Sequence, residues 1–142
     1  MPRFTVQRFM TARPHVVSSQ KTLAQAHQAM REKGIRHLPV VDGGKLVGVV
    51  SQRDLYLLET LKGVDIARET IEEAMTADPI TVPPDAPLDE VAEAMAARKQ
   101  GSAVVVDRGA VVGIFTTTDA MKALVAVLRR SRRPRGGGED ED

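Results

Sequence analysis

The chain has 142 residues, of which 42% are apolar, and a formal net charge of +1. It contains no cysteine, which excludes disulfides, thiolate metal sites and cysteine nucleophiles. No apolar run approaches the roughly 18 residues of a membrane span, and the N-terminus lacks the apolar region of a signal peptide, so we expect a cytoplasmic protein without membrane contact.

The first half of the chain predicts two helices and a hairpin. Thr22 is a suitable N-cap for a helix whose apolar residues recur along one face, and Gly34 is a suitable end for it. Val-rich segments on either side of Asp42-Gly43-Gly44 predict a hairpin. The expected elements, in chain order, are a short strand at 15–18, a helix at 22–34, a hairpin at 37–50 and a helix at 52–61.

A connector over residues 63–72 leads into a second half with the same order of elements. Apolar residues near 71–74 predict a short helix at the end of this connector. The later elements are a strand at 80–82, a helix that bears Leu88, Val91 and Met95, a hairpin at 103–115 and a helix at 118–128. The predicted domains are therefore a first unit at 1–62, a second unit at 73–130 and a charged tail at 131–142.

The two halves are related by an internal repeat with a spacing of 65 residues, because residues 10–54 align with residues 75–119 without a gap. The most characteristic stretch is a glycine, two apolar residues, Ser or Thr, two further residues and Asp. It occurs at 48–54 and again at 113–119. A repeat of this size predicts that each unit buries its open face against the other.

A hydroxyl residue and an acid lie in both units where a buried strand gives way to a helix. These are Ser51 and Asp54 in the first unit, and Thr116 and Asp119 in the second. Such a pair can cap the first turn of the helix. It can also hold the two hydroxyl groups of a ribose. The duplication of the whole stretch favours the ribose interpretation, and capping stays open as the alternative.

The chain has no apolar residue after Leu128. Residues 129–135 contain five arginines, and residues 139–142 are all acidic. This composition predicts disorder, and we interpret the segment as a solvated tail, with an anion or RNA tether as the alternative. The rest of the chain carries balanced charge, which argues against a nucleic-acid-binding face on the folded body.

The repeated pattern resembles the CBS domain, a family named for cystathionine β-synthase. The resemblance rests on Met-Thr and Pro before the first strand, Leu-Pro-Val-Val-Asp at 38–42, and the stretches at 48–54 and 113–119. Two such units form a Bateman module, and the resemblance covers about residues 4–130. It implies an α+β fold of two tandem units, each strand-helix-strand-strand-helix. The units would contribute a pair of three-stranded sheets packed about a pseudo-twofold axis, with two clefts between them.

In this family the clefts bind adenosine compounds, so the resemblance implies AMP, ADP, ATP or S-adenosylmethionine as ligand and no obligatory cofactor. Ribose would meet Asp54 in one cleft and Asp119 in the other, with nearby side chains from Ser51, Arg53, Thr116 and Thr118. Adenine would lie against the short first strands, at His15, Val16 and Val17 and at Ile80, Thr81 and Val82. Phosphates would meet Arg36 and His37. The matching Gly101 and Ser102 carry no charge, so we expect unequal sites.

The resemblance implies a regulatory module that senses an adenosine nucleotide and acts in trans on an unknown partner protein, because no output domain is recognisable. The alternative is a ligand-free module for structural or protein–protein contacts. We do not expect an enzyme, since the sequence shows no nucleophile–base pair and no phosphate-binding glycine loop. We also expect no metal site, because His15, His27 and His37 are too dispersed to be metal ligands.

The helices that follow the two turn motifs bear apolar residues on one face. Such a face usually belongs to the core. In Bateman modules, however, these helices pair two copies of the protein, so the resemblance implies a homodimer. The residues concerned are Leu55, Leu58 and Leu61 in the first unit and Met121, Leu124 and Leu128 in the second.

Overall fold

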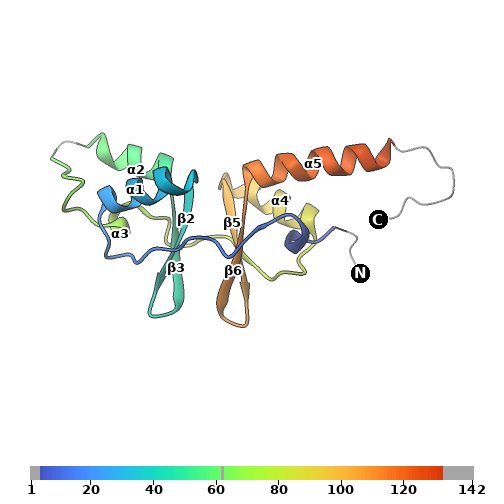
Figure 1. The fold of residues 1–142 in the computed structure, drawn as a ribbon, viewed down its shortest axis with the longest axis horizontal. Helices are drawn as coiled ribbons and strands as arrows, with labels where there is room; N and C mark the ends of the chain where they lie inside the picture. The colour runs from blue at the N-terminus through green and yellow to red at the C-terminus, as the bar shows by residue number, and fades with distance from the viewer. Residues whose placement is uncertain (1–3, 62, 133–142) are drawn as a thin grey trace.

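The computed structural model describes residues 4–61 and 63–132. Two β-hairpins stand side by side in the middle of the molecule, with the helices of the first unit on one side and those of the second unit on the other (Figure 1). The hairpins are β2–β3 (His37–Asp42, Lys45–Ser51) and β5–β6 (Ser102–Asp107, Ala110–Thr116). The helices are α1 (Leu23–Lys33), α2 (Gln52–Glu59), α3 (Ile71–Ala74), α4 (Leu88–Arg98) and α5 (Thr117–Ser131). The predicted α+β fold of two tandem units is confirmed.

Local sequence explains the ends of helix α1. The Thr22 hydroxyl accepts a hydrogen bond from the Gln25 N–H at 3.1 Å, and the Gln25 amide oxygen accepts one from the Thr22 N–H at 2.9 Å. These reciprocal bonds satisfy N–H groups that have no partner inside the helix. Gly34 ends the helix in the left-handed conformation, with φ of 65°. The predicted start and end of this helix are confirmed.

The two hairpins turn in the same way. Gly43 and Gly44 have φ of 56° and 80°, and Arg108 and Gly109 have φ of 53° and 82°. Two consecutive residues with positive φ give a turn whose twist matches that of the flanking strands. Each hairpin also shifts its register once, after Val40 in the first unit and at the matching position in the second. The predicted hairpins are confirmed.

The sheets differ from the expected pair of three-stranded sheets. One has four strands in the order β1-β6-β5-β4, where β1 is Thr11–Ala12 and β4 is Thr81–Val82, and the other contains β2 and β3 alone. In the first unit, the expected strand at 15–18 is reduced to one parallel bridge between Val17 and Val40. The chain leaves the sheet there because the Asp42 carboxylate accepts hydrogen bonds from the Ser19 N–H and from the side chains of Ser18 and Ser19.

The segment before each unit packs on the other unit. Strand β1 pairs antiparallel with β6, so residues 11–12 of the first repeat lie on the second hairpin. Val6, in the 3-10 helix η1 (Val6–Arg8), is fully buried in the second core. Conversely, Thr76 pairs with Val49, and Ile71 is fully buried in the first core. The blue N-terminal trace in Figure 1 accordingly lies beside α4 before it crosses to the first unit. Each unit's core is therefore completed by the segment that precedes the other unit.

This crossing explains the repeated glycine of the turn motif. A Cβ atom on Gly48 would lie 2.7 Å from both the Met75 Sδ and the Thr76 carbonyl oxygen. A Cβ atom on Gly113 would overlap the Met10 Sδ. The glycines are therefore needed where the crossing segment lies directly on the hairpin. The sequence analysis identified the glycine as part of the motif, but not this contact.

Buried side chains form one core in each unit and a third cluster between the hairpins, made of Val49, Val104 and Ile114. Leu55 is fully buried in the first core, and Leu58 packs against it. Burying a leucine fully stabilises the fold by roughly 1.5–3 kcal/mol. Leu55 thus belongs to the core, which is the usual place of such an apolar face.

Helix α5 continues beyond the predicted end at Leu128. It runs to Ser131, which the sequence analysis assigned to the charged tail. The remainder of that tail, residues 133–142, for which disorder was predicted, lies outside the described residues. Within the described ranges, the helices are all too short or too polar to cross a membrane.

Candidate functional site

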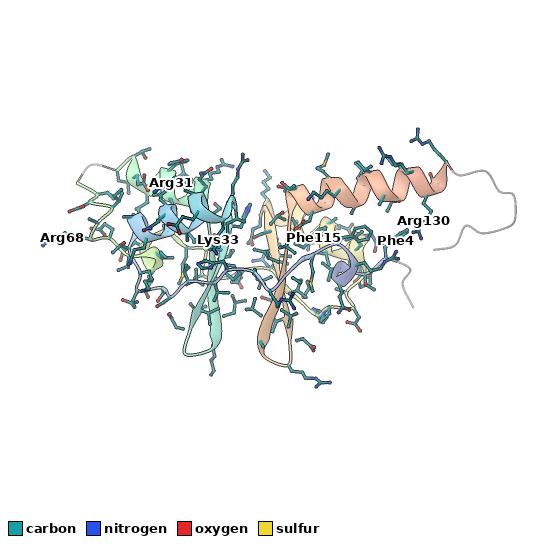
Figure 2. All side chains as sticks on the ribbon, viewed as in Figure 1. Phe4, Arg31, Lys33, Arg68, Phe115 and Arg130 are labelled. Atoms are coloured by element: carbon teal, nitrogen blue, oxygen red, sulfur yellow. The ribbon has the colours of Figure 1, made fainter. Side chains whose placement is uncertain are left out.

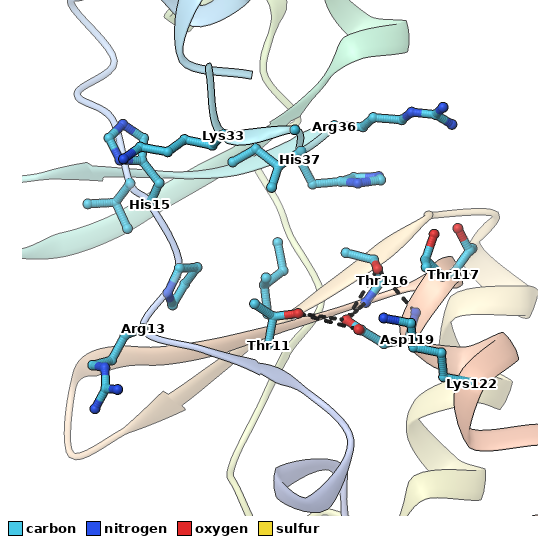
Figure 3. Close-up of a pocket in the computed structure, with 16 residues that line it drawn as sticks. Thr11, Arg13, His15, Lys33, Arg36, His37, Thr116, Thr117, Asp119 and Lys122 are labelled. Carbon is cyan, nitrogen blue, oxygen red and sulfur yellow. Dashed lines mark hydrogen bonds between the residues drawn. The ribbon is translucent and has the colours of Figure 1, made fainter. Parts of the chain in front are cut away.

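A large cleft of about 950 Å³ opens between the two units. Figure 3 shows it with His15 and Lys33 of the first unit facing Thr116 and Lys122 of the second. The lining residues are Thr11, Arg13, Pro14, His15, Val16, Lys33, Gly34, Ile35, Arg36, His37, Ile114, Thr116, Thr117, Thr118, Asp119 and Lys122. The fold therefore brings together seven of the predicted ligand-binding residues, which are His15, Val16, Arg36, His37, Thr116, Thr118 and Asp119.

Asp119 lies in the first turn of α5 and is only 7% exposed. Its Oδ2 accepts a hydrogen bond from the Thr116 N–H at 3.0 Å, while the Thr116 hydroxyl accepts one from the Asp119 N–H at 3.4 Å. The capping interpretation is thus confirmed for this pair. A carboxylate has about four lone-pair sites, so capping leaves Asp119 able to accept further hydrogen bonds from a ligand.

Thr11 is a residue of this site that the sequence analysis missed. Its hydroxyl donates to the Asp119 carboxylate at 3.3 Å from Oδ1 and 3.4 Å from Oδ2 (Figure 3). The contact forms because β1 crosses to the second hairpin. These bonds are longer than a usual O–H···O bond, so a ligand hydroxyl can replace the Thr11 hydroxyl at small cost. The recurrence of Thr11 as Thr76 was the one signal available in the sequence.

The large cleft is strongly basic. Among the described residues that line it, the four permanent cations are Arg13, Lys33, Arg36 and Lys122, whereas Asp119 is the one acid. Burial lowers the pKa of His37, and the neighbouring Arg36 guanidinium lowers it further, while the Asp54 and Asp119 carboxylates raise it. The net direction is downward, so the His37 imidazole is neutral near pH 7 and adds no charge to the cleft.

A smaller cleft of about 770 Å³ contains the turn motif of the first unit. Its lining residues are Arg36, His37, Val49, Ser51, Gln52, Arg53, Asp54, Tyr56, Leu57, Thr60, Thr76, Lys99, Gln100, Gly101 and Ser102. The Asp54 Oδ2 accepts a hydrogen bond from the Ser51 N–H at 2.8 Å, and the Ser51 hydroxyl accepts one from the Asp54 N–H at 3.0 Å. Capping is therefore confirmed here as well. The predicted residues Ser51, Arg53 and Asp54 lie together, and Arg36 and His37 line both clefts.

The smaller cleft lacks the wall at which adenine was expected. Ile80 is 4% exposed and belongs to the second core, and the exposed Thr81 directs its hydroxyl to the Pro79 carbonyl at 3.3 Å. Neither residue lines either cleft. The clefts thus differ on the adenine side, while the expected inequality at the phosphate side, from the uncharged Gly101 and Ser102, stays a prediction.

The adenine sides of the two units differ in charge. Arg13 and Lys33 of the large cleft correspond in the repeat to Asp78 and Arg98. The Arg98 Nη2 donates to the Asp78 carbonyl at 2.8 Å and lies 3.2 Å from its carboxylate. The Asp78–Arg98 pair thus joins the chain before β4 to the end of α4, and because both side chains are exposed it contributes at most about 1 kcal/mol.

The family comparison agrees with this architecture. The chain matches the CBS domain over residues 6–58 and 71–126. The chain belongs to the CBS domain family. Its two units are therefore CBS units, and the predicted tandem pair is confirmed.

Solved CBS pairs have the same fold. A Vibrio cholerae protein assigned to acetoin utilization (AcuB) superimposes with a TM-score of 0.82 and 33% identity, covering 94% of this chain and 100% of that chain. The CBS pair of protein MJ0100, in complex with 5′-methylthioadenosine and S-adenosyl-L-methionine, gives 0.80 and 31%, covering 89% and 99%. CBSX2 of Arabidopsis thaliana, in complex with AMP, gives 0.77 and 30%, covering 89% and 99%. Adenosine compounds are the ligands in both complexes.

Curated relatives place CBS pairs in proteins of different kinds. The inosine-5′-monophosphate dehydrogenase of Korarchaeum cryptofilum is 38% identical over 104 residues, 72% of this chain and 21% of that protein. The CBS domain-containing protein YhcV of Bacillus subtilis is 28% identical over 115 residues, 81% of each. This chain spans between 15% and 23% of the length of the first four enzymes that it matches. The similarity to these enzymes concerns a minor part of each. Within the described residues, His, Asp and Glu side chains do not gather in threes around a potential metal position.

Proposed function

We propose that this CBS pair is a regulatory module, not an enzyme, that binds one adenine nucleotide in the large cleft and transmits its presence to a partner protein. The observation that carries the proposal is the meeting of Asp119, Thr11 and Thr116 with the His15–Val16 segment across one cleft. Adenosine compounds bound to CBSX2 and to protein MJ0100 support it. Adenine nucleotides are abundant in the cytoplasm, which is the location we propose.

The cleft offers a suitable group for each part of a nucleoside. The Asp119 carboxylate can accept hydrogen bonds from both ribose hydroxyls once the Thr11 hydroxyl gives way. The half-exposed Val16 side chain and the His15 ring provide an apolar and aromatic surface for adenine. These assignments use groups from both units, so a bound nucleoside would connect the units and favour one relative orientation over another.

Charge supports a phosphorylated ligand over S-adenosylmethionine. S-adenosylmethionine carries a sulfonium, an ammonium and a carboxylate, so its net charge is positive near pH 7. A cleft with four permanent cations and one acid repels such a ligand and attracts phosphates. We therefore propose AMP, ADP or ATP as the ligand, with affinity rising with the number of phosphates. Arg13, Lys33, Arg36 and Lys122 would supply the attraction.

A pair of matched substitutions tests the proposal. Asp119→Asn and Asp54→Asn change the same capping position in the two units, so they weaken the same kind of helix start. Titration calorimetry should show that Asp119→Asn weakens ATP binding by roughly tenfold or more, whereas Asp54→Asn binds as the unchanged protein does. An equal loss in both variants would contradict the assignment to one cleft. If AMP, ADP and ATP all failed to bind at millimolar concentration, the sensor proposal itself would fail.

A second candidate function is a ligand-free interaction module, which exposed apolar side chains favour. Met121, Leu124 and Leu128 on α5 are 61%, 47% and 52% exposed, and Leu57 and Leu61 in the first unit are both 58% exposed. Such side chains in contiguous patches mark protein contacts. We propose that they pair two copies into a homodimer. Light scattering of Met121→Glu/Leu128→Glu should then give a monomer, and a monomeric unchanged protein would refute this pairing.

A further inference from the structure

The second unit contains a further cavity that shares no lining residue with either cleft. It is a groove of about 670 Å³ between the start of α4 and the inner face of α5. Its lining residues are Phe4, Pro87, Leu88, Asp89, Glu90, Ala92, Phe115, Ala120, Ala123, Leu124 and Val127. Figure 2 shows Phe115 and Phe4 beneath α5, with Arg130 beside Phe4. Most of this lining is apolar, and the volume lies in the usual range of small-molecule sites, about 300–1,000 Å³.

The internal repeat shows why the groove exists. Ala120, Ala123 and Ala92 correspond to Leu55, Leu58 and His27 in the first unit. There the same space is filled, because Leu55 is fully buried and Leu58 packs against the core. His27 forms a hydrogen-bonded pair with Glu59 and lies 5.4 Å from the Tyr56 ring. Three alanines in the second unit thus remove side chains that close the equivalent groove in the first.

An unfilled apolar space is costly. Replacing a buried leucine by alanine without compensation typically lowers the free energy of unfolding by about 2–5 kcal/mol. The second unit compensates in part, since Phe115 replaces Val50 at the floor of the groove. The remaining space is still large enough for a molecule of drug-like size. An occupant that fills it would recover burial that the chain itself does not provide.

The charges at the groove indicate which apolar molecule fits. Asp89 and Glu90 are the charged side chains among the described residues that line it, and they stand in the first turn of α4. One Asp89 oxygen accepts a hydrogen bond from the Glu90 N–H at 3.0 Å. Two carboxylates repel a fatty acid and attract an ammonium group. The Arg130 guanidinium lies 5.5 Å from the Phe4 ring centroid and is not among the residues that line the groove.

We propose that this groove binds a small hydrophobic amine, with its apolar body against the accessible side chains of Leu88, Ala92 and Leu124 and its ammonium group beside Asp89 and Glu90. The proposal goes beyond nucleotide binding and does not depend on it. The occupant's apolar body would lie in the space that Leu55 and His27 fill in the first unit and that Ala120 and Ala92 leave open in the second. Its positive charge would distinguish it from the phosphorylated ligand proposed for the large cleft.

The test uses N-phenyl-1-naphthylamine, a neutral probe whose fluorescence rises in apolar surroundings, with decyltrimethylammonium and decanoate as competitors. We expect the full-length protein to bind the probe, and decyltrimethylammonium to displace it at a roughly tenfold lower concentration than decanoate. Ala120→Leu and Ala92→Leu fill the groove from two different helices and should each weaken probe binding by roughly tenfold. Ala126→Leu and Ala97→Leu add the same side chain at exposed positions of the same helices and should have no effect.

Several results would overturn the proposal. They are the absence of probe binding to the unchanged protein, equal displacement by the two competitors, and equal binding by the groove-filling and control variants. Loss of probe binding as the protein associates at higher concentration would show that a second copy covers the groove. Lys33→Gln, in the first unit, should weaken ATP binding but leave probe binding unchanged. This last measurement separates failure of the groove proposal from failure of the nucleotide proposal.

Discussion

Replacing Gly113 with alanine should destabilise the protein through one neighbouring side chain, that of Met10. The three heavy atoms nearest to the added Cβ are the Sδ, Cε and Cγ atoms of Met10. Overpacking of this kind typically costs about 1–3 kcal/mol, while removing a glycine from a strand recovers about 0.5–1 kcal/mol. We therefore expect a net loss of about 1–2 kcal/mol in the free energy of unfolding for Gly113→Ala.

In a protein that already carries Met10→Ala, Gly113→Ala should no longer be destabilising. With the methionine side chain gone, Gly113→Ala keeps the gain in strand conformation and loses the overlap, so it should be neutral or slightly stabilising. The matching pair in the first unit behaves differently. A Cβ on Gly48 would lie 2.7 Å from the Thr76 carbonyl oxygen as well as from Met75. Because backbone moves less easily than a side-chain end, Met75→Ala should rescue Gly48→Ala only in part.

Urea unfolding of the single and double variants measures both thermodynamic cycles. The expected coupling energy between positions 10 and 113 is about 1–2 kcal/mol and exceeds that between positions 48 and 75. If Gly113→Ala cost the same with and without Met10, close approach of the crossing segment would not be the reason for this glycine. The explanation of the repeated glycine given above would then be refuted.

Three further predictions concern charge and pH. Burial lowers the pKa of His37 below 6.5 in the protein without nucleotide, and a bound phosphate favours the protonated ring. The ATP affinity measured by calorimetry should therefore rise as pH falls towards 6.5. His37→Gln should remove this dependence on pH. Lys33→Gln should weaken ATP more than AMP and leave adenosine unchanged, and equal losses would contradict a phosphate contact. Hydrogen bonds from the Ser19 hydroxyl and N–H lower the pKa of Asp42, so the stability they provide is present above pH 3.8 and lost as pH falls through the lowered pKa. Asp42→Asn should therefore lower Tm at neutral pH, and a difference that persisted under strongly acidic conditions would refute this account.

Sequence alone predicted features that depend on neighbours in the chain. The N-cap Thr22, the turn glycines Gly43 and Gly44, and the helix end at Gly34 all act over a few residues. Their effects are set by backbone hydrogen bonding and allowed φ values, which vary little with tertiary context. The internal repeat added the larger conclusion that two similar units pack together.

The candidate site was predicted in its components but not in its arrangement. The sequence analysis found Asp119 and His15, but it missed Thr11, whose hydroxyl reaches Asp119 from 108 positions away in the chain. It also expected Ile80 and Thr81 to form an adenine wall, which lies in neither cleft. The repeat showed that these positions correspond between units, but correspondence in sequence does not ensure equal exposure.

The sequence by itself determined the two units, their helices and hairpins, and the turn motif that bears Asp54 and Asp119. Tertiary structure decided which groups meet: the crossing of β1 onto β6, the overlap of Met10 with Gly113, and the open side of the large cleft. The physical reason is distance along the chain. Caps and turns form between near neighbours, whereas these contacts depend on how two nearly equivalent units pack, and small differences in charge and side-chain volume make their surfaces unequal.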